Sequence, residues 1–366
     1  MTKSFDEVFE DYTKYGTKIK TEEYCESGEH IIIDQGQEQI AGYTDLEDGL
    51  FEHVPAIVFG DHTRVIKYVD TPFFLGADGV KVLRSKFTDA NYKYLYYALK
   101  NARIPNTGYN RHFKWLKETR INYPNTDRQA KLVGVLDGVT GIIEKRQQQL
   151  SALDDLIKAR FVEMFGDPIV NPKGYPIVPI SDLFDVGSSK RVFESEWRSE
   201  GVPFYRAREI VKLSKDGFVD NDLFIEEGLY EKYKAKYGVP KAGDMMVTGV
   251  GTLGICYIVQ PNDRFYFKDG NTLWFKNKGL CNVRFIMEQY NTDFVRGQIE
   301  ANANVSTVGT YTITNANNTM ILLPSIEEQN EFDSFVSQVD KSKSVIQKAL
   351  DETQLLFDSL MQEYFG

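Results

Sequence analysis

Two stretches of the chain repeat apolar residues at alternating spacings of four and three positions. They begin at Leu132 and at Phe332, so the two copies lie 200 residues apart in the same phase. Such spacing places apolar residues on one stripe of an α-helix and is typical of coiled-coil packing. The pattern predicts two long helices. Their seams are Leu132, Leu136, Val139, Ile143, Leu150, Leu153 and Ile157 in the first, and Phe332, Val336, Val339, Ile346, Leu350, Phe357 and Leu360 in the second.

Both helices have clear start signals, and the first has an equally clear end. Pro124 and Pro324 are each followed by a small polar residue and then by an acid, which opposes the helix dipole in the first turn. Gly166 and Pro168 end the first helix, because neither residue continues one readily. We therefore expect two helices of about 40 residues, roughly 60 Å long at 1.5 Å per residue. Helices of that length in a globular protein need a partner.

The same offset of 200 residues aligns identical residues around the seams, including Phe165-Gly166 with Phe365-Gly366. Outside the helices, the chain consists of short runs of aromatic and β-branched residues broken by glycine turns, such as Ile255–Val259 and His30–Asp34. These runs predict strands. The predicted fold class is α+β, with two mostly-β domains separated by two long helices. The boundaries are a first domain over 1–123, a helix over 124–167, a second domain over 168–323 and a final helix over 324–366.

The composition of the chain indicates only an ordinary globular protein, whereas the distribution of charge along it bears on DNA binding. The chain has 366 residues, of which 42% are hydrophobic and 26% charged, as in an ordinary globular protein. The net charge of −10 argues against a nucleic-acid partner, yet it is uneven. Residues 1–52 hold 4 Lys or Arg against 14 Asp or Glu, whereas residues 53–123 hold 12 against 5. A locally basic face therefore remains compatible with DNA binding.

The sequence favours a cytoplasmic protein without an active site of its own. No apolar run approaches the roughly 18 residues of a membrane span, and the acidic start does not resemble a signal peptide. Walker, HExxH and GxSxG motifs are absent, as are the Glu-x-Lys tripeptide of metal nucleases and the Asn-Pro-Pro-aromatic motif of amino-methyltransferases. A GxGxxG pattern spans Gly249–Gly254, but its strand-rich context disfavours a dinucleotide site. The four histidines lack metal-ligand spacing, and Cys25, Cys256 and Cys281 are expected to be buried thiols.

This arrangement resembles the specificity subunit of Type I restriction–modification systems, the HsdS family. The resemblance covers essentially the whole chain. It rests on the repeat, on the heptads ending in Phe-Gly, and on three segments of the second domain: Val178–Asp185, Gly201–Arg206 and Gly243–Thr248. No counterpart of Gly201–Arg206 is evident near residues 20–40. The first domain is therefore expected to be shorter or divergent.

The resemblance implies a non-catalytic, DNA-binding subunit of a phage-defence system that methylates DNA. Each domain would recognise one half of a bipartite double-stranded DNA target, and the helices would set the spacer. Two methyltransferase subunits would dock on the chain, and two restriction/translocase subunits would complete a restricting complex. S-adenosylmethionine, ATP and Mg would belong to those partners, with no cofactor or metal in this chain. Apolar residues outside the seams are expected to be exposed for docking: Val133, Val135, Ile142, Leu156 and Phe161.

The resemblance also implies that the helices pack antiparallel, with facing positions that sum to about 498. Arg146 would then face Glu352, and Asp155 would face Lys343.

The residues expected to contact DNA combine hydrogen-bond donors with favourable local charge. In the first domain they are His62, Arg64, Lys67, Asn110, Arg111, His112 and Lys114. In the second they are Lys190, Arg191, Arg206, Arg208, Thr248, Thr252, Asn302, Asn304, Ser306 and Thr307. A solvated basic face in the first domain, and ordinary turn chemistry around Asn302–Thr307, are the alternatives.

Two other classes of function stay open at the sequence level. One is a scaffold of a related defence system that uses the same body only to assemble proteins. The other is an enzyme with an unrecognised site in the second domain.

Overall fold

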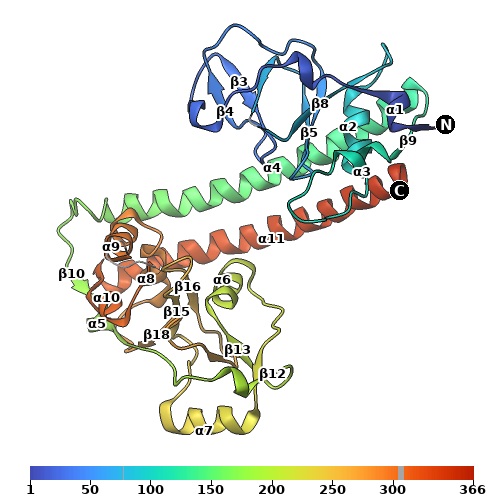
Figure 1. Cartoon of the computed structure of the whole chain (residues 1–366). Coiled ribbons are helices and arrows are strands. Elements are labelled where there is room, and N and C mark those ends of the chain that lie inside the picture. Colours follow the sequence, from blue (N-terminus) through green and yellow to red (C-terminus); the bar gives the residue numbers. More distant parts are fainter. Residues whose placement is uncertain (77, 304–308) are drawn as a thin grey trace. The chain divides into compact units, whose positions relative to one another are not determined.

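A computed structural model describes residues 1–76, 78–303 and 309–366. The chain divides into two compact units (Figure 1): unit 1 comprises Met1–Gln149 and Ile346–Gly366, and unit 2 comprises Leu150–Val345. The long helices α4 (Thr126–Phe165) and α11 (Ile326–Phe365) each contribute one part to unit 1 and the other to unit 2. Each unit therefore combines a β-rich body with a segment of both helices. The predicted α+β class with two long helices is confirmed.

The body of unit 1 contains three small sheets. Strand order is β1-β9 in the first, β2-β8-β5-β6 in the second and β4-β3-β7 in the third, where β3 runs parallel to β7. The strands are β1 (Thr2–Ser4), β2 (Phe9–Asp11), β3 (His30–Ile33), β4 (Gly42–Thr44), β5 (Ala56–Gly60), β6 (Ile66–Val69), β7 (Phe73–Leu75), β8 (Val80–Ser85) and β9 (Arg120–Asn122). The short helices are α1 (Phe5–Val8), α2 (Tyr92–Lys100) and α3 (Phe113–Lys117), with 3-10 turns at Thr13–Tyr15 and Thr21–Glu23.

The body of unit 2 has the same plan. Its sheets have the orders β10-β19, β11-β18-β15-β16 and β12-β14-β13-β17, and β13 runs parallel to β17. The strands are β10 (Ile177–Pro179), β11 (Phe184–Gly187), β12 (Trp197–Arg198), β13 (Val202–Tyr205), β14 (Phe224–Ile225), β15 (Met245–Thr248), β16 (Cys256–Ile258), β17 (Tyr266–Phe267), β18 (Thr272–Asn277) and β19 (Met320–Leu322). The helices are α5 (Ile180–Leu183), α6 (Ala207–Asp216), α7 (Glu227–Tyr237), α8 (Val283–Gln289), α9 (Asp293–Ala303) and α10 (Ile313–Asn318), with a 3-10 turn at Glu194–Glu196.

The matching topologies show that the repeat extends beyond the helices. Strand β3 occupies in unit 1 the place that β13 occupies in unit 2, with one antiparallel and one parallel neighbour. The first domain therefore contains a structural counterpart of Gly201–Arg206 at His30–Asp34, and the sequence of this segment diverges from that of the second copy, as expected. The sequence concealed it because the strand is a plain isoleucine run that ends in Asp34 where the second copy has Arg206. In unit 2, α6 and α7 follow β13 before β15 begins, whereas only β4 lies between β3 and β5.

The two long helices run antiparallel within each unit. In unit 1, the Arg146 guanidinium donates to the carbonyl oxygen of Ala349 and to the Thr353 hydroxyl. In unit 2, Lys343 Nζ lies 2.6 Å from Asp154 Oδ1, and Arg160 Nη2 lies 3.2 Å from Glu331 Oε1. The direction and the approximate register are as expected.

Both predicted charge pairs are nevertheless wrong by one position. Glu352 does not partner Arg146, and Asp155 lies 3.6 Å from Lys158 on its own helix instead of pairing with Lys343. One residue along a helix is a rotation of about 100°, so only the neighbour on the seam side faces the other helix. Exchanging the charges of Arg146 and Glu352 is therefore not expected to preserve stability.

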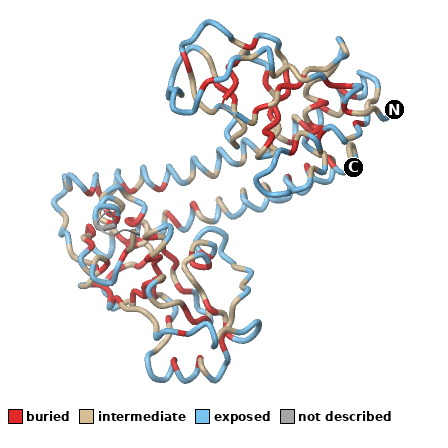
Figure 2. Tube along the Cα trace, viewed as in Figure 1, coloured by how far each residue is buried: buried red, intermediate tan, exposed pale blue. Residues whose placement is uncertain are grey.

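The seam residues are all buried or half-buried, and Leu136, Phe332 and Val336 are fully buried. Figure 2 shows that the long helices are otherwise largely exposed, whereas the strands in each unit are mostly buried. Five apolar residues outside the seams were expected to be exposed. Three of them, Val135, Ile142 and Leu156, are 45–46% exposed. Val133 and Phe161 are buried, because each packs into the hydrophobic core of its own unit. Val162, Val345, Leu355 and Leu356 are also exposed.

Candidate nucleic-acid interface

Cations of unit 1 gather around the short helix α3. Lys114 is exposed, with its ammonium 3.7 Å from the centre of the Trp115 ring. Lys117 and Lys81 lie 5.2 and 5.1 Å from the centre of the same Phe113 ring. The two lysines therefore reach one place from α3 and β8. Aromatic rings beneath the ammonium groups hold Lys114 and Lys117 close to the surface without neutralising their charge.

A second group of lysines adjoins the first. Lys14, Lys18 and Lys81 line a shallow groove of about 540 Å³ together with Asp11 and Thr13. Lys81 lies 3.0 Å from Asp11, and Lys18 lies 2.8 Å from Asp78.

Asp78 connects this groove to the loop before α3. A hydrogen bond from Lys18 and its charge lower the pKa of Asp78, and the charges of Arg111 and His62 act in the same direction. We call the whole set the basic face of unit 1: Lys14, Lys18, His62, Lys81, Arg111, Lys114 and Lys117. Four of these residues were not predicted from the sequence. Lys14 and Lys18 come from the segment that is acidic on average, and only the strand pairing brings Lys81 next to it.

Two of the residues expected to contact DNA in unit 1 are buried instead, which contradicts the prediction. Lys67 is 3% exposed, because its ammonium donates to the carbonyl oxygen of Glu38 and lies 3.4 Å from Asp34 Oδ1. Burial lowers the pKa of Lys67, although the charge of Asp34 opposes that shift. His112 is fully buried, and its Nδ1 lies 3.0 Å from the carbonyl oxygen of Asp61. Both side chains stabilise the fold.

The remaining predicted residues of unit 1 are accessible to different degrees. Arg64 is half-buried, has a positive φ of 64° and donates to the carbonyl oxygen of Ile104 at 3.3 Å. Asn110 and Arg111 are exposed in the loop before α3, and the Asn110 amide donates to the carbonyl oxygen of Thr107. His62, in the turn after β5, is half-buried. The structure thus brings His62, Arg111 and Lys114 onto the basic face.

In unit 2, the predicted arginines are paired with acids. Arg191 lies 2.8 Å from Asp269, while Lys190 beside it is exposed. Arg206 and Arg208 both pair with Glu209 and with Asp222. The Asp222 carboxylate lies 2.9 Å from the Arg206 guanidinium and 2.6 Å from that of Arg208. Burial alone would raise the pKa of Glu209, but the hydrogen bonds from both arginines lower it. This cluster therefore stabilises the start of α6 and leaves little free positive charge.

The glycine-rich turn of unit 2 is a hairpin connection between β15 and β16. Thr248 is fully buried, and its hydroxyl donates to the carbonyl oxygen of Thr252 and accepts from the N–H of Ile255 at 3.0 Å. It therefore holds the turn and is not available to DNA, contrary to prediction, whereas Thr252 is exposed. Gly254 leads into a strand and not into a helix, as expected of a turn that holds no dinucleotide. The side chain of Asn302 and all of Asn304, Ser306 and Thr307 lie outside the described residues.

The two units differ in how many of their arginine side chains form ion pairs. Within residues 1–76, 78–149 and 346–366, no arginine forms an ion pair. In the described part of unit 2, every arginine except Arg296 does. Arg296 donates instead to the carbonyl oxygen of Leu253 at 2.7 Å. Guanidinium groups without a carboxylate partner can bind phosphates, and Arg111 is an exposed group of this kind in unit 1.

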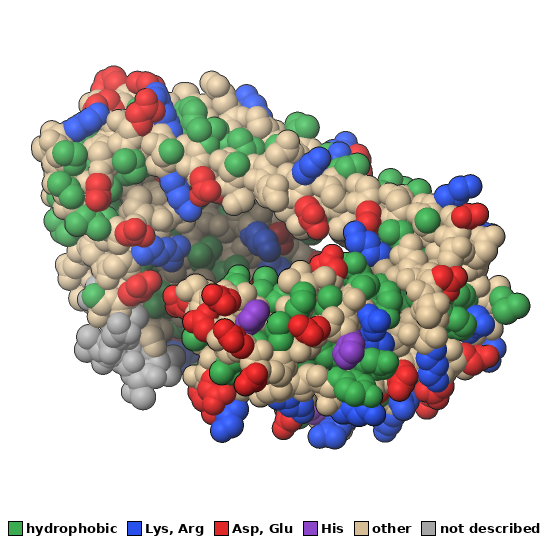
Figure 3. Space-filling model, turned by 90° about the horizontal axis from the view of Figure 1, so that it is seen from above, with side chains coloured by type: hydrophobic (Ala, Val, Ile, Leu, Met, Phe, Trp, Pro, Cys, Tyr) green, Lys and Arg blue, Asp and Glu red, His purple; other side chains and the backbone are tan. Residues whose placement is uncertain are grey.

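Charge is also unevenly spread over the surface. On the face shown in Figure 3, a cluster of acidic side chains lies apart from groups of lysine and arginine side chains.

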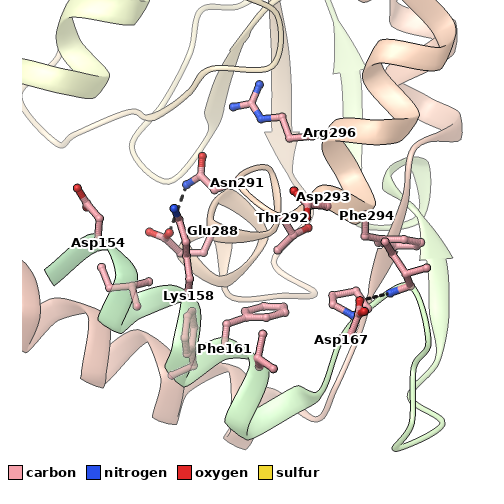
Figure 4. Close-up of a pocket in the computed structure, with 15 residues that line it drawn as sticks. Asp154, Lys158, Phe161, Asp167, Glu288, Asn291, Thr292, Asp293, Phe294 and Arg296 are labelled. Atoms are coloured by element: carbon pink, nitrogen blue, oxygen red, sulfur yellow. Dashed lines mark hydrogen bonds between the residues drawn. The ribbon is translucent and has the colours of Figure 1, made fainter. Parts of the chain in front are cut away.

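Unit 2 also contains an open cleft of about 710 Å³ between the end of α4 and the segment around α8 and α9 (Figure 4). Its lining includes the apolar residues Phe161, Phe294 and Phe332 and charged residues such as Lys158 and Glu288. Its lining, which lies entirely within the described residues, includes no histidine, cysteine or serine. The cleft therefore gives no support to nucleophilic catalysis by those residue types in the second domain.

Metal and thiol chemistry find little support in the described residues. In that part of the chain, no group of three or more His, Cys, Asp or Glu side chains could hold a metal ion. Cys256 and Cys281 are buried thiols as expected, but Cys25 is exposed, because it lies beside the edge strand β4. None of the described helices is both long and apolar enough to cross a membrane.

Comparison with known proteins gives consistent results. No protein-family model matches the sequence. A Haemophilus influenzae protein named as a type I restriction enzyme specificity subunit is 23% identical over 254 residues, which cover 68% of this chain and 62% of that protein. The MjaIX specificity subunit of Methanocaldococcus jannaschii is 27% identical over 138 residues, which cover 33% of this chain and 31% of that protein. The chain thus spans less than two thirds of the length of these relatives.

The fold is also found among solved structures. A crystal structure of the Type I restriction–modification S subunit from M. genitalium matches with a TM-score of 0.60 and 16% identity, covering 100% of this chain and 96% of that one. At this identity the match establishes the fold. Together these comparisons show that the chain has the fold of a Type I restriction–modification S subunit and is similar in sequence to two proteins named as Type I specificity subunits.

Proposed function

We propose that this chain is the non-catalytic, sequence-specific DNA-binding subunit of a Type I restriction–modification complex. Each β-rich body recognises one half of a bipartite target, and the antiparallel helices set the unread spacer. The observation that carries this proposal is the repeated topology: one strand arrangement occurs twice, and each copy is joined to equivalent helix segments. Two copies of one recognition module suit a target read in two halves.

The partners of this complex follow from the same proposal. Two methyltransferase subunits dock on the chain, and two restriction/translocase subunits join them where the complex also cleaves DNA. S-adenosylmethionine, ATP and Mg are bound by those subunits. The docking of the methyltransferase is supported by exposed apolar residues on the long helices, such as Val135 and Leu355 in unit 1 and Val345 in unit 2.

Exchange of one domain tests the proposal directly. Replacing residues 168–323 with the equivalent segment of a related specificity subunit should change one half of the methylated site and leave the other half intact. The measurement is single-molecule sequencing of methylated bases in cells that carry the hybrid chain. Loss of both halves at once would contradict independent recognition, and unchanged methylation would contradict recognition by this segment.

Docking on the helices predicts how the isolated chain behaves. Exposed apolar side chains on both helices should make the chain aggregate alone, and co-expression with its methyltransferase should keep it in solution. Size-exclusion chromatography with light scattering measures both states. A stable monomer at high concentration would contradict this prediction.

The burial of Lys67 yields a test that separates stability from DNA contact. Lys67→Met removes a donor to Glu38 and the partner of Asp34, so it should lower the free energy of unfolding by about 1–3 kcal/mol. DNA affinity of the folded protein should stay the same. Urea unfolding and fluorescence anisotropy with duplex DNA measure the two effects, and a loss of affinity without a loss of stability would show that Lys67 contacts DNA after all.

The two alternative classes of function make different predictions. A pure scaffold would assemble its partners but retain no DNA, and an enzyme would turn over a substrate without partner chains. Within the described residues, we find no arrangement of side chains that favours either alternative over DNA recognition.

A further inference from the structure

The loop before α3 is held firmly at its base. The N–H of His112 donates to the carbonyl oxygen of Asp61 at 2.8 Å, and the N–H of Phe113 donates to the Asp61 carboxylate at 2.7 Å. The buried His112 ring also reaches the start of the loop, since its Nε2 lies 3.3 Å from the Thr107 hydroxyl. The residues between Thr107 and His112 are therefore presented on a fixed base.

Tyr109 at the tip of this loop is 87% exposed. Its ring stacks on the His62 ring with the centres 4.6 Å apart and the planes inclined by only 8°. His62 covers one face of the tyrosine and leaves the other face to solvent. Two flat rings from different parts of the chain thus form one rigid aromatic projection, which we call the Tyr109–His62 stack.

The His62 side of this stack is fixed as well. His62 is half-buried, and its backbone N–H donates to the Gln35 side chain at 3.2 Å. Its Nδ1 is buried and has no hydrogen-bond partner within the described residues. The His62 backbone is therefore held by Gln35 and the half-buried imidazole by packing, so the ring supports the tyrosine from behind.

The surroundings of the stack indicate what it contacts. Arg111 follows Tyr109 by two residues, and Lys114 lies on the first turn of α3. Both are exposed cations of the basic face. An exposed aromatic ring flanked by unpaired cations suits nucleic acid, in which a base offers a π-face and the adjacent phosphates offer negative charge. A protein partner with a small apolar pocket would not need these cations.

We propose that Tyr109, backed by His62, is a specificity-determining residue of unit 1 that wedges against a base step of duplex DNA, while Arg111 contacts the adjacent phosphate. This inference rests on the proposed DNA-binding function. A wedge partly unstacks the step it enters and is favoured where the step deforms easily. The half of the target read by unit 1 should therefore contain a pyrimidine–purine step, such as TA or CA, at the position of contact.

The test uses the assembled complex of the full chain with its methyltransferase subunits, and duplexes that carry the methylated target. 2-Aminopurine is placed in turn at each purine of both half-sites, because its fluorescence rises when a base unstacks. Apart from the target base that the methyltransferase itself flips out of the duplex, the wild-type complex should raise the signal at one step of the half-site read by unit 1. Tyr109→Ala should abolish that rise and weaken binding by about 5- to 150-fold, the value of one base–aromatic stack.

Three further variants separate the stack from general effects. Tyr109→Phe keeps the ring and should retain both affinity and the fluorescence rise. His62→Ala removes the support and should give an intermediate loss of both. Phe218→Ala removes an aromatic ring of unit 2 that is 70% exposed, and it should leave this half-site unchanged.

The outcomes distinguish this inference from the proposed function. If the wild-type complex binds and methylates DNA but Tyr109→Ala changes neither affinity nor fluorescence, the wedge is wrong while the proposed function stands. If Tyr109→Ala instead prevents assembly with the methyltransferase, the ring docks a protein and the inference is overturned. If the wild-type complex shows no affinity for any duplex, the proposed function itself fails.

Discussion

Phe332→Ala is expected to lower the free energy of unfolding by about 3–5 kcal/mol, the usual cost of removing a fully buried phenylalanine. Phe332 is fully buried on α11 in unit 2. Its ring centre lies 5.6 Å from that of Phe161 and 5.7 Å from that of Phe165, both on α4, and 6.0 Å from that of Phe285 on α8. All three contacts are edge-to-face, with interplanar angles between 75° and 89°. The substitution therefore leaves a cavity and removes three favourable aromatic interactions at once.

Urea unfolding of the full chain measures this effect as a lower transition midpoint. Val345→Ala, at a 70% exposed position of the same helix, is the matched control and should change stability by less than about 0.5 kcal/mol. Equal losses for the two variants would mean that the helix pair of unit 2 is not held together by the Phe332 cluster.

The combined variant Arg111→Gln, Lys114→Gln and Lys117→Gln is expected to weaken DNA binding by about a hundredfold or more at 0.1 M salt. The slope of log affinity against log salt falls by about 0.9 for each phosphate that the protein no longer neutralises, so the slope should fall by up to roughly three. The three side chains are exposed and take part in no ion pair within the described residues. Removal of their charge should therefore leave the fold intact.

The control removes the same charge elsewhere in unit 1. Lys20, Lys131 and Lys145 are exposed and lie outside the basic face, so changing all three to glutamine should alter affinity and slope far less. Fluorescence anisotropy across a salt series gives both quantities. A similar loss in the two triple variants would indicate that net charge, and not the basic face, governs binding.

The sequence by itself determined the long-range plan of this protein. A helix stripe depends only on which residues recur every three or four positions, so two long helices could be predicted directly, and the structure contains both of them with the predicted seam residues buried or half-buried. The doubled arrangement followed, because two copies in one register specify two similar units. Positions off the seam were only partly predictable: Val135, Ile142 and Leu156 are exposed as expected, whereas Val133 and Phe161 are buried in the cores of their units.

Only the tertiary structure decided which side chains are available to a ligand. Lys67 and His112 looked like free donors in the sequence, but Asp34 and Asp61, far away along the chain, bury and bind them. Arg206 and Arg208 lose their free charge to Asp222, which reaches them only after α6 has folded back. In the same way, Lys14 and Lys18 lie on the basic face although the segment around them is acidic on average. The ring of Tyr109, in the loop before α3, stacks on the ring of His62, in the turn after β5. Helix periodicity is a local property of the chain, whereas burial and charge pairing depend on partners that only the fold brings together.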